Sequence, residues 1–322
     1  MELIYFPRMG LDGVIYTRED IESLFAEGIA DEIKAELDKI TPYSKKEKRC
    51  LEFLKNQVDF LLIAKPETLE RIKKVTDRLH LLGKGKMMSK RFMKKIKNAF
   101  GYERYRGVRL VEHAERLNVK TCCYCNMNYT LLIEQKKART IEKKALMQFD
   151  HFYDKAKYPH LSMSMYNLIP SCATCNQGKP RKGNLPIHFN PYYTSLFELY
   201  QFRVKDPLQL YMAVSHPEKI EVECKPKNGD DISQCDSWFH LSAKYSVHKD
   251  IVREVFNKAQ QYPYYRNNLN FSYLKVDQSY LLRLLLGVYT EEKDYVKRPM
   301  SKFVNDLWEQ ASVFYKWRKE KT

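Results

Sequence analysis

The chain has 322 residues, of which 44% are hydrophobic and 30% are charged. These proportions exclude a mainly disordered chain, and the length suits one large domain or two to three smaller ones. Lysine plus arginine exceed aspartate plus glutamate by 56 to 40, a net charge of +16, which favours a polyanionic partner over an uncharged one. No apolar run has the length of a membrane span, and MELIYFPRMG lacks the pattern of a secretory signal, so we expect a cytoplasmic protein without a membrane partner.

Residues 1–118 are expected to form a helical N-terminal region. Ser44 and Glu47 match a capping box, and apolar residues follow at helical spacing within 51–62. Pro66 suits the first turn of the next helix. The expected buried side of that helix consists of Leu69, Ile72, Val75 and Leu79.

Positive charge is concentrated near residues 84–109. Phe92, Ile96 and Phe100 predict the apolar stripe of a short helix whose other surfaces carry lysine and arginine, and a mixture of arginines and tyrosines follows. Cations neutralise phosphates and aromatic rings stack on bases, so this stretch is a candidate nucleic-acid flank. An ordinary solvated helix surface is the alternative interpretation. A further helix is predicted over 108–117.

Two Cys-x-x-Cys pairs follow, Cys122 with Cys125 and Cys172 with Cys175. In a cytoplasmic chain such pairs are metal ligands more often than disulfides. Four thiolates match a tetrahedral structural zinc site, which has no open coordination position for chemistry but contributes to the folding of a small unit. The remaining cysteines are expected to be buried free thiols, namely Cys50, Cys123, Cys224 and Cys235.

An Asp-His dipeptide, Asp150 and His151, lies between the two cysteine pairs at the end of a predicted strand. A carboxylate binds hard divalent cations such as magnesium or manganese, and a neutral imidazole can remove a proton from water. Neighbouring strand residues point to opposite faces, so both serve one site if the strand ends or twists there. Asn176, directly after Cys175, can complete the cation site with its amide oxygen. The set suits metal-assisted phosphodiester hydrolysis.

Residues 193–322 are expected to be mixed at first and then helical. The aromatic-rich segment 196–213 is a candidate for strands, and the alternation over 220–224 has the period of a strand. The helical period returns from Val247, and Pro299-Met300-Ser301 begins a last amphipathic helix.

The run of DH, then N, then C-x-x-C-N-x-x-K closely resembles the HNH endonuclease family, which has a ββα-metal fold. The resemblance implies that His151 is the general base, that Asn167 holds the loop between the two strands, and that Asn176 replaces the last histidine of the motif. It further implies that Asp150 and Asn176 hold the catalytic magnesium or manganese ion. The residues implied to lie near the nucleic-acid backbone are Lys179, Arg181 and Lys182.

The longer phrases FDHFYDKAKYP, MYNLIPSCATCNQGK and HFNPYY are similar to the HNH subunits of Septu-type anti-phage systems. That similarity implies an ATPase partner and a role in bacterial antiviral defence. We therefore expect a mainly helical α+β chain with a zinc-stapled ββα-metal core at 119–192, flanked by helical regions, that acts as a metal-dependent endonuclease on DNA.

Three alternatives stay open from the sequence. A non-catalytic, zinc-dependent nucleic-acid-binding module needs the same cysteines and the same basic charge, but not Asp150, His151 and Asn176. A nuclease that cleaves RNA or tRNA needs the same catalytic residues. A subunit that is active only inside a complex would carry them too, and would cleave only after its partner is added.

Overall fold

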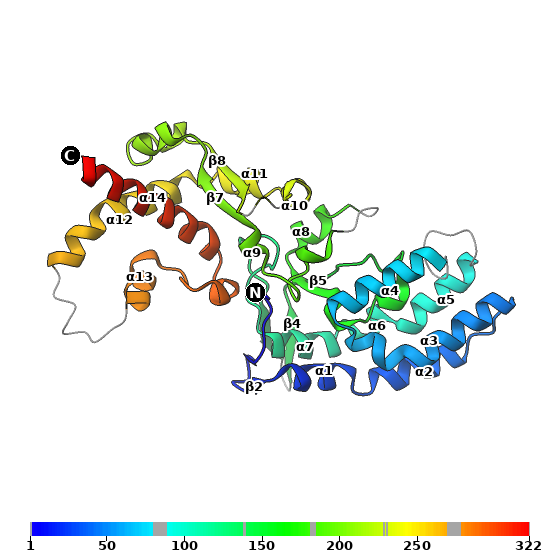
Figure 1. Ribbon diagram of the computed structural model, residues 1–322. Coiled ribbons are helices and arrows are strands. Elements are labelled where there is room, and N and C mark those ends of the chain that lie inside the picture. The colour runs from blue at the N-terminus through cyan, green and yellow to red at the C-terminus, as the bar shows by residue number, and fades with distance from the viewer. Residues whose placement is uncertain are drawn as a thin grey trace. The chain divides into compact units, whose positions relative to one another are not determined.

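The computed structural model of the protein describes residues 2–79, 89–137, 140–180, 185–227, 229, 231–268 and 278–321. It confirms an α+β chain that is mainly helical, with four antiparallel sheets of two strands each among the described residues (Figure 1). No helix in these ranges is both long enough and apolar enough to cross a membrane.

The chain folds into two compact units. Unit 1 comprises Met1–Val119 and Thr130–Ser195, and unit 2 comprises Lys120–Tyr129 and Leu196–Thr322. The predicted N-terminal region and most of the predicted core thus belong to the same unit instead of forming two consecutive regions. The sequence did not indicate this, because the apolar faces of the N-terminal helices do not reveal which later segment they pack against.

Among the described residues, unit 1 contains seven helices and two small sheets before its central segment. Their bounds are β1 (Arg8–Met9), β2 (Ile15–Tyr16), α1 (Arg18–Ala26), α2 (Ile29–Asp38), α3 (Lys45–Ile63), α4 (Pro66–Leu79), α5 (Lys90–Phe100), α6 (Tyr102–Tyr105), α7 (Arg109–Leu117), β3 (Leu132–Lys136) and β4 (Ile141–Ala145). Helix α2 packs against both α3 and α5, and these three helices lie side by side (Figure 1).

Local capping chemistry sets the ends of these helices. The Ser44 side chain accepts a hydrogen bond from the Glu47 backbone at the start of α3, and Ser89 does the same for Phe92 at the start of α5. Helix α5 ends at Gly101, whose φ of 53° is the left-handed conformation that glycine adopts without a steric penalty. The predicted start of α3 is therefore confirmed.

The apolar stripe of α5 is confirmed, whereas the one predicted for α4 is partly wrong. Phe92, Ile96 and Phe100 are all buried. In α4, Leu69 is buried but Val75 is 50% exposed. At about 100° per residue, Val75 lies well away from Leu69 around the helix axis. The turn that faces the core instead contains the buried Thr76.

The central segment of unit 1 has a strand–strand–helix order. Strand β5 (Gln148–His151) pairs with β6 (Leu168–Ser171) in antiparallel register, with His151 opposite Leu168, and α8 (Ala173–Gly178) follows at once. Pro170 is tolerated in β6 because the sheet has only two strands, so each has an edge without a ladder partner. The short 3-10 turns of this segment are η1 (Pro159–Leu161), η2 (Met165–Asn167) and η3 (Ile187–Phe189).

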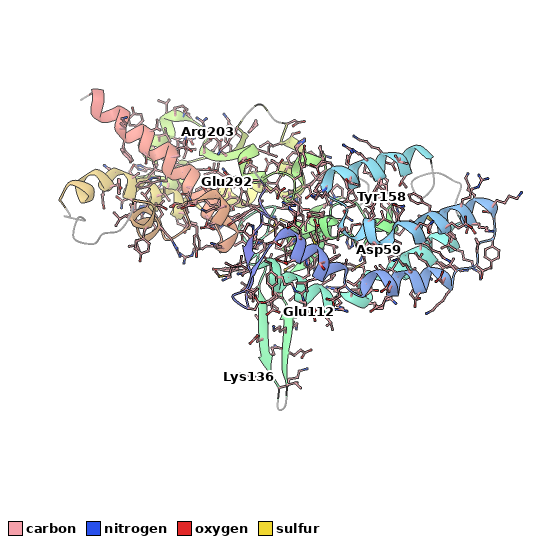
Figure 2. The ribbon with its side chains drawn as sticks, turned by 60° about the horizontal axis from the view of Figure 1, so that its bottom comes forward. Asp59, Glu112, Lys136, Tyr158, Arg203 and Glu292 are labelled. Carbon is pink, nitrogen blue, oxygen red and sulfur yellow. The ribbon has the colours of Figure 1, made fainter. Side chains whose placement is uncertain are left out.

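The β3–β4 hairpin precedes the central segment and projects from unit 1, with Lys136 near its far end (Figure 2). Residues 132–136 and 142–145 of this hairpin are partly or fully exposed. Only Leu146 and Met147 separate β4 from β5, so the hairpin leads directly into the strand that contains Asp150 and His151.

Unit 2 begins with a short helix and a hairpin, and then is helical as predicted. Its elements are α9 (Leu196–Leu199), β7 (Tyr200–Val204), η4 (Pro207–Met212), η5 (Pro217–Lys219), β8 (Val222–Pro226), α10 (Ser233–Phe239), α11 (Leu241–Ser246), α12 (Lys249–Asn268), α13 (Gln278–Leu286), η7 (Glu292–Lys297) and α14 (Ser301–Lys321). Helices α12 and α14 pack side by side (Figure 1). Phe303, Leu307 and Ala311 of α14 are fully buried, which confirms the predicted apolar face.

Candidate functional site

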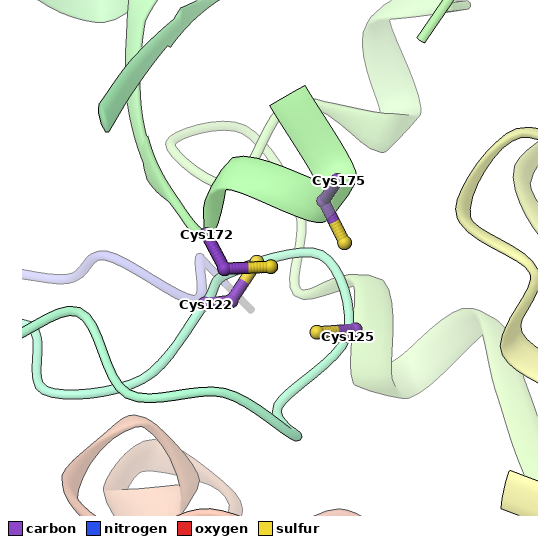
Figure 3. Close-up of side chains that lie close together, drawn as sticks. All are labelled: Cys122, Cys125, Cys172 and Cys175. Carbon is purple, nitrogen blue, oxygen red and sulfur yellow. The ribbon is translucent and has the colours of Figure 1, made fainter. Parts of the chain in front are cut away.

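The four paired cysteines form one cluster. The Sγ atoms of Cys122, Cys125, Cys172 and Cys175 lie within 4.8 Å of one another, and all four residues are buried (Figure 3). Tetrahedral zinc with Zn–S bonds of about 2.3 Å separates its sulfurs by about 3.8 Å, so only a small closure is needed. The cluster can therefore hold a metal ion such as zinc, as the spacing predicts.

The segment that contains Cys122 and Cys125 is held by Asn126. This residue adopts a left-handed φ of 50° and is fully buried. Its Nδ2 donates to Tyr295 O at 2.7 Å, and its Oδ1 accepts from the Lys302 backbone at 2.9 Å. A further hydrogen bond, from Nδ2 to Thr121 Oγ1 at 3.0 Å, helps to fix the turn that follows the first cysteine pair.

Strand β5 divides its side chains between two sides, as strand alternation requires. Gln148 and Asp150 make their hydrogen bonds to α8 and the residue that follows it. Phe149 and His151 instead contact aromatic rings from the N-terminal helices. The side chains of Asp150 and His151 thus lie on opposite faces of β5, and both residues stand at the end of this strand.

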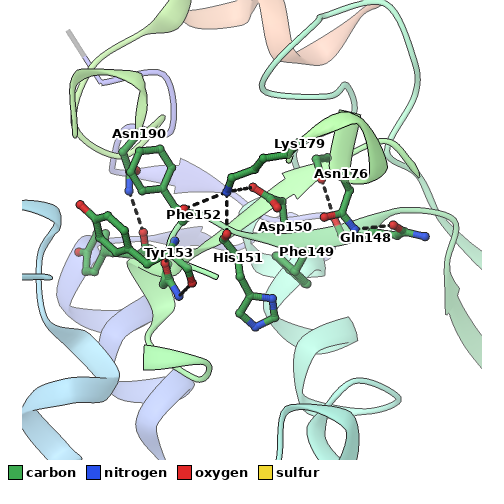
Figure 4. Close-up of polar contacts among 12 residues, drawn as sticks. Gln148, Phe149, Asp150, His151, Phe152, Tyr153, Asn176, Lys179 and Asn190 are labelled. Carbon is green, nitrogen blue, oxygen red and sulfur yellow. Dashed lines mark hydrogen bonds and ion pairs between the residues drawn. The ribbon is translucent and has the colours of Figure 1, made fainter. Parts of the chain in front are cut away.

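Asp150 forms an ion pair with Lys179, the residue that ends α8. Lys179 Nζ donates to Asp150 Oδ2 at 2.9 Å, to His151 O at 2.7 Å and to Phe152 O at 2.8 Å (Figure 4). The ammonium has three donor hydrogens, and these three acceptors use them all. Lys179, which the resemblance placed near the nucleic-acid backbone, is an internal partner of the Asp150 carboxylate in this structure.

The imidazole of His151 points away from Lys179 (Figure 4). Its Nε2 lies 3.0 Å from Ser162 O. A carbonyl only accepts, so Nε2 carries the proton and Nδ1 has the lone pair in the neutral ring. Burial and, to a smaller extent, the positive charge of Lys155 lower the pKa of His151 to about 3. At neutral pH the ring is therefore neutral, the form that can accept a proton.

Tyr102, from the one-turn helix α6, positions the same imidazole from the other side. The two ring centroids lie 4.5 Å apart in an edge-to-face arrangement. Burial raises the pKa of the Tyr102 hydroxyl to about 12, so this ring stays uncharged at neutral pH.

Asn176 lies in α8 one residue after Cys175. Its Nδ2 donates to Gln148 Oε1 at 2.5 Å, and its backbone N donates to Cys172 O at 3.0 Å. With Nδ2 directed at Gln148, the acceptor atom of the amide is Oδ1, the atom type that binds magnesium or manganese.

Asn167 is fully buried within the loop that joins β5 to β6. Its Oδ1 accepts from the Tyr153 backbone at 2.7 Å, and its Nδ2 donates to Leu161 O at 2.8 Å and to Tyr153 O at 3.1 Å. One side chain thus makes hydrogen bonds to both halves of the loop.

A cavity of about 270 Å³ brings these groups together, and we refer to it as the main cavity. Its lining includes Asp150, His151, Asn176 and Lys179. Residues that carry a carboxylate, an amide and a neutral imidazole therefore all contribute to the lining of one cavity. This set of donors fits a hard divalent cation, because oxygen ligands dominate and room remains for water or phosphate oxygens.

The main cavity is also lined by Tyr102, Glu103 and Lys155, which were not among the predicted site residues. Tyr102 and its neighbours carried a weak signal as a basic-aromatic stretch, whereas Lys155 carried none. The predicted contacts Arg181 and Lys182 lie outside the described residues. Comparison with models of known families, with characterised proteins and with solved structures found no match for this chain.

Proposed function

We propose that the protein is a metal-dependent endonuclease of the HNH type that hydrolyses phosphodiester bonds of DNA. The observation that carries the proposal is the main cavity, where Asp150, His151 and Asn176 converge on a strand–strand–helix segment. The net charge of +16 is consistent with a polyanionic substrate.

In this mechanism His151 is the general base. Its Nδ1 accepts a proton from a water molecule while Nε2 keeps its own hydrogen and donates it to Ser162 O, so the neutral ring starts from one tautomer. The oxygen of that water bonds to the phosphorus, and the bond from phosphorus to the leaving oxygen breaks. Tyr102 keeps the imidazole in place by its ring contact.

Asp150 and Asn176 would hold the divalent ion. Lys179 orients the Asp150 carboxylate, and Gln148 directs the Asn176 amide. When bound, a magnesium or manganese ion supplies charge stabilisation to the phosphate and the leaving oxygen. Zinc on the four cysteines would have a separate, architectural role, because Cys175 and Asn176 are neighbours in α8.

A plasmid assay tests this proposal. The zinc-loaded protein is incubated with supercoiled plasmid and with total RNA, with magnesium or manganese, and with or without EDTA. We expect DNA cleavage that EDTA stops and that His151→Ala abolishes while circular dichroism and zinc content are unchanged. His216→Ala, which changes an exposed histidine, is the matched control and should cleave normally.

Other outcomes of this assay separate the alternatives. Tight DNA binding without cleavage would favour a non-catalytic binding module, and cleavage of RNA alone would favour an RNase. Cleavage at the wild-type rate by His151→Ala would exclude the mechanism. The defence role and the ATPase partner are proposed from the sequence resemblance, and activity that appears only after adding a partner ATPase would support them. The cytoplasmic location is proposed from the absence of a secretory-signal pattern in MELIYFPRMG.

A further inference from the structure

A second cavity of about 300 Å³ lies beside the main cavity. Its lining includes three cations, Lys97, Arg104 and Lys155, and one carboxylate, that of Glu103. Lys155 and Glu103 also line the main cavity. These two residues therefore belong to the wall between the two spaces, and the second cavity has an excess of positive charge.

Lys155 is held in this wall by two contacts. Its Nζ lies 2.7 Å from Glu103 Oε1 and 4.3 Å from the centroid of the Tyr102 ring. The ion pair remains accessible, with 28% of the Lys155 side chain and 66% of the Glu103 side chain exposed. Exposed pairs of this kind add little to stability, so the contact can be exchanged for another anion without unfolding the site.

Lys155 and His151 both contact the ring of Tyr102. The Tyr102 ring contacts the Lys155 ammonium on one side and the His151 imidazole on another. An anion bound by Lys155 would therefore lie next to the main cavity. A phosphate group suits such a position, because a nucleic-acid strand that has one phosphate in the main cavity carries its neighbouring phosphates only a few ångströms away.

We propose that Lys155 binds a backbone phosphate that neighbours the scissile phosphate on the same DNA strand. Glu103 is an internal anion that holds the ammonium until phosphate replaces it. This inference rests on the proposed nuclease function. Lys97 and Arg104 extend the positive lining of the second cavity along the same strand. Glu103 lowers DNA affinity in this scheme, since its carboxylate competes with phosphate for the same cation.

Fluorescence anisotropy with a short fluorescein-labelled DNA duplex, without added magnesium and over a series of salt concentrations, measures this competition. Lys155→Gln should raise the Kd by about three- to tenfold and reduce the slope of log Kd against log salt by about one. Glu103→Gln should lower the Kd severalfold. In the double variant the effect of Glu103→Gln should become smaller, because without Lys155 the Glu103 carboxylate competes only through its longer contact to Arg106, at 3.8 Å.

An exposed pair in unit 2 provides matched controls. Lys205 and Glu221 form an ion pair at 2.9 Å, with 58% and 62% of their side chains exposed. Lys205→Gln and Glu221→Gln make the same changes in charge away from both cavities. The proposal is overturned if Glu103→Gln binds DNA no more tightly than Glu221→Gln, or if its effect is undiminished when Lys155 is replaced.

The plasmid assay keeps this inference distinct from the proposed function. If the wild-type protein does not cleave DNA but Lys155→Gln, Glu103→Gln and the double variant bind DNA as expected, the phosphate site stands and the nuclease proposal fails. If cleavage depends on His151 but both Lys155→Gln and Glu103→Gln bind DNA like the wild type, only the phosphate site fails. Thermal melts that match the wild type show that the variants remain folded.

Discussion

Lys179 and Asp150 form an ion pair at 2.9 Å although only 7% and 6% of their side chains are exposed. The other two hydrogens of the same ammonium are donated to the carbonyls of His151 and Phe152. The end of α8 is thereby joined to the end of β5, the two elements that contain the proposed ion ligands.

We expect Lys179→Met to destabilise the protein. The variant would remove the ammonium that pairs with a buried carboxylate and donates to two carbonyls, and breaking a buried ion pair typically costs about 3–5 kcal/mol of unfolding free energy. Urea unfolding measures the loss. Adding Asp150→Asn should recover part of it, since the uncompensated charge is removed. Lys205→Met is the exposed control, and an equal effect of the two lysine variants would show that burial of the pair is unimportant.

We expect Cys172→Ser to lose zinc and to lower the melting temperature. A serine hydroxyl is a poor substitute for a thiolate in a four-sulfur site. Zinc content per chain, measured by atomic absorption, is the primary readout. Cys123→Ser is the control, because Cys123 is equally buried but is not one of the four clustered ligands. A zinc content in Cys172→Ser equal to that of the wild type would refute the structural-zinc assignment.

We expect Asn167→Asp to be destabilising despite its similar size. The carboxylate can still accept from the Tyr153 backbone, but it cannot donate to Leu161 O and Tyr153 O. Each buried acceptor that loses its donor costs about 1–3 kcal/mol. Unfolding free energy and plasmid cleavage should fall together while zinc is retained. Normal stability would mean that the loop is held by other contacts.

We expect stability to decrease on acidification, in part because of His113. Burial lowers its pKa from 6.5 to about 3, and neither ring nitrogen has a hydrogen-bond partner among the described residues. Below pH 6.5 the unfolded chain binds a proton that the folded state excludes, so unfolding becomes easier as the pH falls towards 3. This histidine contributes up to about 1.4 kcal/mol per pH unit across that window.

His113→Phe tests this assignment. The ring of His113 lies 4.8 Å from the ring of Phe25, so phenylalanine preserves an aromatic contact while removing the titrating group. The unfolding free energy of this variant should fall less than that of the wild type between pH 7 and pH 4. Parallel pH profiles for the two proteins would show that His113 does not contribute.

Several local features were predictable because they depend on neighbours in sequence. Ser44 caps α3, and the apolar stripe of α5 is buried, since both depend on spacing within one helix. Val75 was misplaced because it lies well away from Leu69 around the axis of α4, and only packing decides which side of the helix faces the core. The grouping of the N-terminal helices with the central segment had no local signal at all.

The sequence by itself determined which candidate ligand and base residues stand at fixed intervals along the chain. The two Cys-x-x-Cys pairs predicted a metal cluster, and the Asp150-His151 dipeptide with Asn176 predicted a shared site, because the required donor types stand at the required intervals. Only the tertiary structure decided that Lys179 neutralises Asp150, and that Ser162 O selects the tautomer of His151.

The tertiary structure also decided that Tyr102, Glu103 and Lys155 border the site. Tyr102 and His151 are far apart in the chain, and their contact depends on how α6 packs against the end of β5. Such a contact leaves no periodic pattern in either segment, because packing selects partners by shape and position in space, whereas a sequence motif records only distance along the chain.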